Sequence, residues 1–238
     1  MTARSRDARH AASVLPAPAD KAQRVEEMFD RIAPRYDRLN RLLTFRLDVG
    51  WRRRTVRALG LDAGARVLDI ACGTGDLCNE LTRQRLEPIG VDFSAGMLRA
   101  ARTTAPLVRA DALRLPVRRA GADGLVCGFA LRNLVALEPF FSECARVVRT
   151  GGRIALLDVA EPEWGPARVV HGVYFRRVVP FVGGRLSDRS AYRYLPESTS
   201  YLPPGPELVA SVEAAGFVDV RQRLLGMGAA QLVTATRR

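Results

Sequence analysis

The amino-acid sequence predicts an α/β protein with a doubly wound, largely parallel sheet, and three observations support this prediction. Short buried-strand patterns alternate with helical patterns between residues 66 and 158, as expected for parallel strands joined by right-handed crossovers. A glycine-rich turn at residues 72–76 follows the first strand pattern. The chain has 238 residues, of which 47% are hydrophobic and 26% charged. That is enough apolar material for one sizeable core and too much for a disordered chain.

The first 60 residues are predicted to form a tail followed by a helical cap. Residues 1–20 are rich in Arg, Ala and Pro and show no periodicity, which indicates a disordered tail and not a secretory signal. From Lys21, apolar side chains recur at helical spacing, and this stripe ends before Pro34. Two further helical patterns follow, the second ending at Gly60. Residues 21–60 are therefore expected to be helical.

Strand and helix patterns alternate through the predicted core, residues 61–160. The strand patterns are short and apolar, and they span residues 66–71, 88–92, 107–111, 124–129 and 154–158. Residues 161–204 follow as an insertion. The chain then ends in a helix and two strands, at residues 206–215, 217–224 and 229–236, which fit an antiparallel edge pair. Because no linker follows residue 20, residues 21–238 are predicted to form a single domain.

Composition and charge exclude several classes of protein. No apolar run approaches the roughly 20 residues that span a bilayer, which predicts a cytoplasmic rather than an integral membrane protein. The four cysteines show no CxxC spacing, so neither a disulfide scaffold nor a metal site is expected. The net charge of +12 arises from 37 basic residues of which only Lys21 is lysine. We attribute this charge to an Arg-rich composition and expect no nucleic-acid partner, whereas transient contact with an anionic membrane surface remains open.

The glycine-rich turn is predicted to bind a ligand other than a dinucleotide. Gly73 and Gly75 lie between a strand and a helix, where main-chain N–H groups converge on a ligand. The third glycine of a dinucleotide fingerprint is absent. Asp69 and Asp76 instead place two carboxylates around the turn, an arrangement that suits a cationic or zwitterionic ligand better than a diphosphate.

Acidic residues at the ends of the next two strands complete the predicted cofactor site. Asp92 closes the second strand 19 residues after Gly73, where a carboxylate can accept hydrogen bonds from both hydroxyls of a ribose. Asp111 and Ala112 end the third strand, where a carboxylate can accept from an adenine amino group. Together these features predict S-adenosyl-L-methionine as the cofactor. The alternative is a simple glycine turn with solvated acids at the strand ends.

The same segments resemble a known family. Residues 68–76 (LDIACGTGD), 90–98 (GVDFSAGML), 110–113 (ADAL) and 145–158 (ARVVRTGGRIALLD) resemble a class I S-adenosylmethionine-dependent methyltransferase, with its Rossmann-like seven-stranded sheet. The flanking segments resemble the ubiquinone/menaquinone-biosynthesis C-methyltransferases, as seen in residues 28–53, 129–134 (FALRNL) and 192–198 (YRYLPES). This resemblance implies methylation of a ring carbon of a polyprenylated hydroquinone, which is demethylmenaquinol or the ubiquinone-pathway benzoquinol. Residues 161–204 would then lie on the substrate side.

The residues that the motifs and the resemblance assign to the site fall into two groups. Cofactor contacts are expected from Asp69, Ala71, Gly73, Thr74, Gly75, Asp76, Asp92, Phe93, Met97, Asp111 and Ala112. Arg132 would stabilise a developing phenolate while Asn133 orients the ring oxygen. The remaining catalytic candidates are two possible carboxylate bases, Asp48 and Asp158, and two orienting residues, Tyr36 and Asp37. The chain departs from the family's pattern at Asp48 (usually His), Gly128 (often Ser) and Asp158 (usually Glu).

Several alternatives stay open at this stage. The acceptor could be a soluble aromatic metabolite. An RNA or protein acceptor is disfavoured, because residues 129–133 contain neither a Pro-Pro-aromatic run nor a Pro-Cys nucleophile. A non-catalytic scaffold of a quinone-synthesis assembly is disfavoured by the intact glycine turn and strand-end acids. Residues 174–181 could line a tunnel for an isoprenoid tail or belong to the core, and His171 is interpreted as structural. If that tunnel opens to the surface, the positive charge suits a peripheral position at the inner face of the membrane. A homodimer is also left open.

Overall fold

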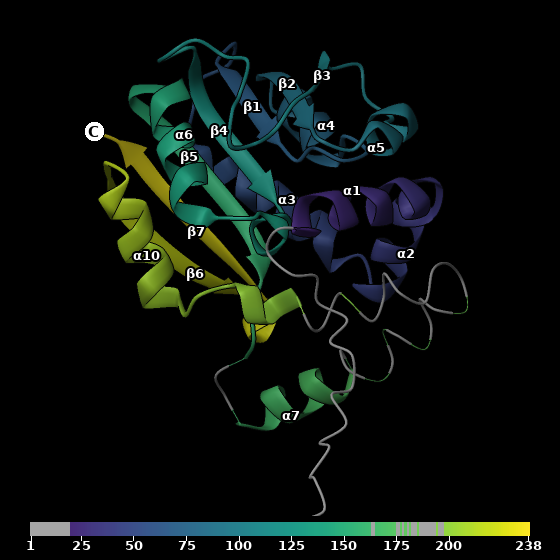
Figure 1. Cartoon of the computed structure of the whole chain (residues 1–238). Coiled ribbons are helices and arrows are strands. Elements are labelled where there is room, and N and C mark those ends of the chain that lie inside the picture. Colours follow the sequence, from purple (N-terminus) through teal and green to yellow (C-terminus); the bar gives the residue numbers. More distant parts are fainter. Residues whose placement is uncertain are drawn as a thin grey trace, which may run out of the picture.

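The computed structural model describes residues 20–162, 165–174 and 198–238, together with residues 177, 179, 181, 185 and 194. Within these residues the chain builds one seven-stranded sheet in the order β3-β2-β1-β4-β5-β7-β6. Helices cover both faces of this sheet (Figure 1). The doubly wound α/β fold that the sequence predicts is confirmed, whereas residues 1–19 of the expected tail lie outside the described residues.

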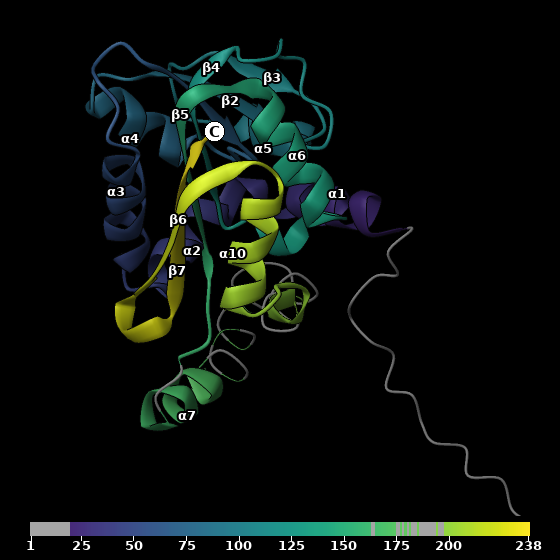
Figure 2. The same ribbon diagram turned by 90° about the vertical axis from the view of Figure 1, so that its left-hand side faces the viewer.

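The predicted helical cap is present as three helices. α1 (Lys21–Ile32) is followed by a 3₁₀ turn (Ala33–Arg35) that carries Pro34, then by α2 (Tyr36–Leu43) and α3 (Leu47–Leu59). α3 ends at Gly60, whose φ of 60° is the left-handed conformation that glycine adopts most readily at a helix end. The apolar stripe of α1 buries Met28 and Ile32. α1 and α2 thereby cover the ends of the central strands, while α3 packs on a sheet face (Figure 2).

The five strands of the predicted core are parallel. They are β1 (Arg66–Ile70), β2 (Glu87–Asp92), β3 (Leu107–Arg109), β4 (Ala122–Gly128) and β5 (Val148–Val159). β1 pairs with β2 on one side and with β4 on the other. After β1 the chain continues to β2 and β3 on one side of the sheet, and after β4 it continues to β5 on the other side, so the strand order reverses between β1 and β4. Ligands of doubly wound folds bind at the carboxyl ends of strands at such a switch point.

The helices between these strands are α4 (Asp76–Arg83), α5 (Ala95–Ala100) and α6 (Leu137–Val147). α4 starts directly after the glycine-rich turn, with Gly75 as its N-cap residue. Its first turn therefore faces the switch point between β1 and β4.

β5 starts earlier than the sequence pattern suggests. The pattern predicts a strand from Ile154, whereas β5 begins at Val148, which pairs with Ala122 of β4. The register shifts between Ala122 and Gly124, and this irregularity takes up the two glycines at positions 151 and 152, which read as a turn in the sequence. The strand thus continues past the glycines as an irregularity, in which Gly151 keeps a left-handed φ of 74°.

The C-terminal elements are α10 (Gly205–Ala214), β6 (Phe217–Leu225) and β7 (Ala230–Arg237). The predicted antiparallel pair is confirmed, and the structure adds that β7 lies between β5 and β6. The burial of the two strands agrees with this strand order. The first four residues of β7 are all buried, as expected for an inner strand covered on both faces. Along β6, more buried and more exposed residues alternate, as expected for the strand at the edge of the sheet.

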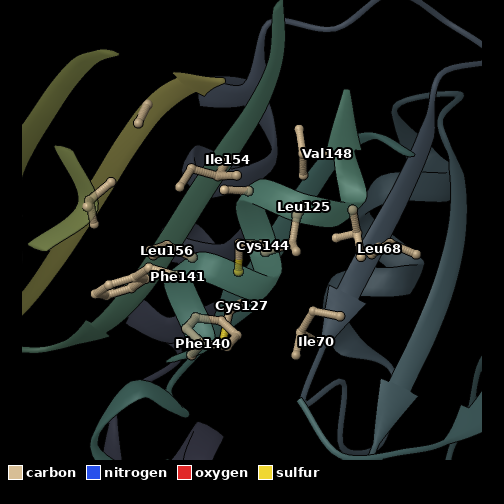
Figure 3. Close-up of a cluster of buried hydrophobic side chains, with 14 of the residues drawn as sticks. Leu68, Ile70, Leu125, Cys127, Phe140, Phe141, Cys144, Val148, Ile154 and Leu156 are labelled. Carbon is tan, nitrogen blue, oxygen red and sulfur yellow. The ribbon is translucent and has the colours of Figure 1, made fainter. Parts of the chain in front are cut away.

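Apolar side chains from both the sheet and α6 form the largest core cluster (Figure 3). Phe140 and Phe141 of α6 are fully buried against Cys127 and Leu156 of the sheet, and each phenyl ring contributes about 2–3 kcal/mol through burial.

All four cysteines are buried free thiols. α7 (Gly165–Val173) belongs to the insertion, and within the described ranges no helix is long and apolar enough to cross a membrane.

Candidate functional site

A cleft lies at the carboxyl ends of β1, β2 and β4, beneath α1. Ten of the eleven predicted cofactor residues line it, namely Asp69, Ala71, Gly73, Thr74, Asp76, Asp92, Phe93, Met97, Asp111 and Ala112. The eleventh, Gly75, serves the turn instead. Its φ is 89°, and a Cβ there would lie 2.7 Å from the Thr103 side chain. The site therefore needs Gly75 for its backbone path.

Asp92 connects the glycine turn to the end of β2. Its Oδ2 accepts a hydrogen bond from the Gly73 N–H at 2.7 Å, and its Oδ1 accepts from the Ser94 N–H at 2.8 Å. Burial raises the pKa of this carboxyl, and these N–H donors oppose the rise. Each oxygen keeps a second lone pair, so Asp92 can still accept from two ribose hydroxyls.

Asp69 carries a buried oxygen with no partner among the described residues. Its Oδ2 accepts from the N–H and the thiol of Cys78, at 3.0 and 3.2 Å, while its Oδ1 accepts no hydrogen bond. Burial raises the pKa of Asp69 to about 7. A cationic group in the cleft would supply the missing partner and favour the ionised carboxylate. These acceptor groups therefore fit S-adenosylmethionine, whose methionine end is cationic and whose ribose carries two hydroxyls.

A second cavity of about 380 Å³ lies beside the cofactor cleft. The lining of this second cavity is predominantly apolar, and it comes from the cap, the insertion and the turn between β6 and β7. The apolar and aromatic lining residues include Met28, Ile32, Leu43, Phe45, Trp51, Tyr174, Val179, Tyr194 and Met227. Five residues line both spaces and form the wall between them: Phe29, Tyr36, Arg52, Phe129 and Asn133. Sites for small organic molecules are usually of this size and apolar character.

Arg132 and Asp158 form a buried ion pair next to this second cavity. Arg132 lines the cavity, and its Nη1 donates to Asp158 Oδ1 at 2.5 Å and to the Phe129 carbonyl at 2.7 Å. Asp158 is fully buried and also accepts from the N–H groups of Arg132 and Val159. Its oxygens are thus committed to Arg132 and the backbone, and Asp158 holds the Arg132 guanidinium in place. Tyr194 donates to Asn133 Oδ1 at 3.2 Å and orients that amide.

The other three predicted catalytic residues, Tyr36, Asp37 and Asp48, lie in different parts of the site. Tyr36 is part of the shared wall, and burial raises its pKa, against the opposing effect of Arg132 and Arg52. Asp37 lines neither the cofactor cleft nor the second cavity. Its carboxylate accepts a hydrogen bond from the Thr74 hydroxyl at 2.5 Å and so holds α2 against the glycine turn. Asp48 lines the second cavity but is almost fully buried and paired with Arg52.

Arg52 is a site residue that sequence reasoning missed. The sequence signal was present, because Asp48 and Arg52 lie four residues apart on one helix and such pairs face each other. Nothing in that spacing indicates that the pair lies between two cavities. Of the predicted tunnel, Tyr174 and Val179 line the second cavity, while Phe181 is 60% exposed. The side chain of His171 lies outside the described residues.

The fold and this site together define an S-adenosylmethionine-dependent methyltransferase. The sheet order, the glycine turn and the strand-end acids form the cofactor half of the site, and the cavity next to it can hold an acceptor. S-adenosyl-L-methionine is therefore the cofactor. Comparison with known proteins defines the protein more narrowly: the chain belongs to the ubiE/COQ5 methyltransferase family, which it matches over residues 18–237.

Curated relatives match most of the chain. A demethylmenaquinone methyltransferase from Roseiflexus castenholzii is 42% identical over 234 residues, which is 95% of this chain and 98% of the relative. A demethylmenaquinone methyltransferase from Thermus thermophilus is 42% identical over 88% of this chain and all of the relative. The ubiquinone/menaquinone biosynthesis C-methyltransferase UbiE from Syntrophotalea carbinolica is 38% identical over 90% of this chain and 94% of the relative.

Solved structures show the same fold at much lower identity. A SAM-dependent methyltransferase from Thermotoga maritima is 18% identical, with a TM-score of 0.64, and the match covers 90% of this chain and all of that chain. The phosphoethanolamine N-methyltransferase 2 from Haemonchus contortus, in complex with S-adenosyl-L-methionine, is 14% identical with a TM-score of 0.56. That match covers 78% of this chain and 52% of that chain.

Proposed function

We propose that this chain transfers a methyl group to a ring carbon of a polyprenylated hydroquinone, with demethylmenaquinol as the preferred acceptor. The observation that carries the proposal is the apolar cavity that shares a wall with the cofactor cleft and has the Arg132–Asp158 pair beside it. The names of the relatives from Roseiflexus castenholzii and Thermus thermophilus support demethylmenaquinol. The UbiE relatives keep the ubiquinone-pathway benzoquinol as the alternative acceptor.

The chemistry requires an electron-rich ring carbon next to the methyl donor. S-adenosylmethionine supplies the methyl group as an electrophile. A hydroquinone hydroxyl has a pKa near that of tyrosine, about 10, so its neutral form is a weak carbon nucleophile at pH 7. Arg132 can donate to the ring oxygen and stabilise the negative charge that develops there. The ring carbon would bond to the methyl group as the methyl–sulfur bond breaks and leaves its electron pair on sulfur, and the proton that the carbon carried would be lost to water or to a carboxylate.

The residues of the shared wall would hold the ring in place. Phe29 and Phe129 offer apolar faces, and Tyr36 and Asn133 offer polar groups on the same wall. Holding two reactants in a reactive geometry contributes several kcal/mol to catalysis. Asp48 remains a candidate base only when Arg52 and Thr44 release it, because both now donate to its carboxylate.

The mouth of the second cavity supports contact with a membrane surface. We define the apolar rim as Phe45, Leu47 and Met227, which line this cavity and are 73%, 51% and 86% exposed. Phe45 and Met227 have φ values of 50° and 58°, a left-handed conformation that is uncommon for bulky residues and is often found at functional sites. With a net charge of +12, this rim suits an anionic bilayer in which a prenylated quinol is dissolved. This is the peripheral position proposed for the protein.

Complementation tests the acceptor. A bacterial strain that makes both quinones but lacks its own C-methyltransferase would carry this chain, and its lipid extract would be analysed by mass spectrometry. We expect menaquinone to be restored, and restoration of ubiquinone as well would extend the acceptor range to the benzoquinol. Asp92→Ala is the control, because it removes the ribose acceptor. Unmethylated quinones in a strain that produces folded wild-type protein would contradict the proposal.

A further inference from the structure

The cofactor cleft is strongly acidic, and a single basic residue interrupts this pattern. Among its described lining residues the carboxylates are Glu26, Asp69, Asp76, Asp92 and Asp111, and Arg52 is the one cation. These acids suit the sulfonium, amino and hydroxyl groups of the cofactor. The methionine end of the cofactor also carries a carboxylate, which none of the acids can bind.

Arg52 is held in a position to receive that carboxylate. Its side chain is 11% exposed, and one nitrogen, Nη1, donates to the buried carboxylate of Asp48. The guanidinium also lies over the Phe129 ring, 5.3 Å from the ring centroid, a distance typical of a cation–π contact. These two contacts restrict the head group at the wall between the two cavities.

The second nitrogen of Arg52 is less committed. Nη2 lies 3.7 Å from Asp76 Oδ2, which is too long for a hydrogen bond. Asp76 is also paired with a second arginine: Arg41 Nη2 donates a hydrogen bond to Asp76 Oδ1 at 3.0 Å. Asp76 would therefore remain paired if Arg52 turned towards a new anion.

We propose that Arg52 binds the carboxylate of the methionine moiety of S-adenosylmethionine, while Asp48 and Phe129 hold its guanidinium in place. A planar guanidinium suits a carboxylate because two N–H groups can donate in parallel. Arg52 also lines the acceptor cavity, so the same contact connects cofactor binding to the wall against which the acceptor lies. The proposal rests on the cofactor site alone and does not depend on which acceptor is methylated.

Calorimetry with two ligands tests this role. S-adenosylhomocysteine carries the carboxylate, and its decarboxylated analogue keeps the amino group, the ribose and the adenine. In Arg52→Gln we expect the affinity for S-adenosylhomocysteine to fall about 10- to 100-fold, the usual effect of losing a hydrogen bond between charged groups. The affinity for the decarboxylated analogue should change less than about twofold. Arg52→Lys should keep part of the preference for the carboxylate, since it keeps the charge but not the fork.

Arg53→Gln is the matched control. Arg53 is the next residue on α3, but its side chain is 53% exposed and faces Glu80 at 3.9 Å, so both ligands should bind this variant as they bind the wild type. Because Arg52→Gln leaves the buried Asp48 without the cation that the structure pairs with it, the double variant Asp48→Asn/Arg52→Gln serves if the single variant does not fold. Equal losses for the two ligands, or wild-type affinity for S-adenosylhomocysteine, would overturn the proposal.

Discussion

Buried carboxylates determine the chemistry of this protein at the scale of single residues. Asp69, which lines the cofactor cleft, has a buried oxygen with no partner among the residues that the structure describes, whereas Asp158 and Asp48 are each paired with an arginine. The sequence could locate Asp69 and Asp158 because strand ends are visible in it. It could not show that Asp158 is paired with Arg132, since contacts between residues distant in sequence have no local signal. The strand-end acids were therefore predictable, but the partners of Asp158 were not.

The raised pKa of Asp69 predicts pH-dependent cofactor binding. Its folded pKa of about 7 lies above the ordinary value near 3.9, so the folded protein carries this proton across the range between them. A cation in the cleft favours the ionised form, so affinity for S-adenosylhomocysteine should rise between about pH 5.5 and 7, with release of a proton. Calorimetry in two buffers of different ionisation enthalpy measures that release.

Asp69→Asn is the control for this titration. The variant should bind with an affinity that changes little over the same pH range and should release correspondingly less proton. The raised pKa also affects folding. Because the folded protein holds the Asp69 proton more tightly than the unfolded chain does, the free energy of unfolding of the wild type should decrease as the pH rises from about 4 to 7. Proton release in the variant equal to that of the wild type would assign the titration to another group.

Arg132 provides a second test at this scale. Arg132→Lys keeps a positive charge opposite Asp158 but loses the planar guanidinium, whose Nη1 donates both to Asp158 and to the Phe129 carbonyl. We expect kcat for quinol methylation to fall about 100-fold, as for loss of a donor that stabilises developing charge. The affinity for S-adenosylhomocysteine should stay within about twofold of the wild type. A wild-type kcat would remove Arg132 from the mechanism.

At the scale of elements, the cap helices are attached to the cofactor loops by two carboxylates. Asp30 of α1 accepts from the Ser94 hydroxyl at 2.5 Å and from the Gly96 N–H at 2.8 Å. Asp37 of α2 accepts from Thr74 in the glycine turn. The position of α1 therefore depends on the N-terminus of α5, and that of α2 depends on the glycine turn after β1. Periodicity predicted that these helices exist, but it gave no information on where they dock.

Two glycine substitutions test this docking. A Cβ on Gly96 would lie 2.8 Å from the Cα of Asp30, whereas a Cβ on Gly50 in α3 meets nothing within 4 Å. Gly96→Ala should therefore displace α1 and lower the free energy of unfolding by about 1–3 kcal/mol. Gly50→Ala should raise it by about 0.5–1 kcal/mol, because alanine is the better helix former. Urea unfolding measures both, and a Gly96→Ala variant as stable as the wild type would show that α1 docks differently.

At the scale of the whole molecule, the sequence predicted the layers better than the order of the strands. The alternation of strand and helix patterns was sufficient for a doubly wound sheet. It was not sufficient to show that β7 inserts between β5 and β6, because that order depends on burial on both faces of β7. The second cavity could not be predicted either, since its lining comes from the cap, the insertion and the turn between β6 and β7.

The charge of the molecule and its apolar rim predict binding to anionic vesicles. The chain should co-sediment with vesicles that contain anionic phospholipid, and less so with neutral vesicles or at high salt. The double variant Phe45→Ser/Met227→Ser should lose most of this binding, because both side chains lie at the cavity mouth. Val135→Ser is the control, since Val135 is 46% exposed but does not line the second cavity. Equal sedimentation of all three proteins would place the membrane contact elsewhere.

The apolar cavity beside the cofactor cleft is the proposed site of the prenylated quinol. The most direct test compares initial rates of transfer of labelled methyl from S-adenosylmethionine to reduced demethylmenaquinol and to the same naphthoquinol without a tail. Each buried methylene contributes about 0.8 kcal/mol, so one isoprene unit in the cavity should raise kcat/KM about tenfold or more. We predict a product methylated on the ring carbon and this preference for the prenylated acceptor. Equal or faster methylation of the tail-less compound, or label in an added RNA control, would show that the cavity does not select a prenylated quinol.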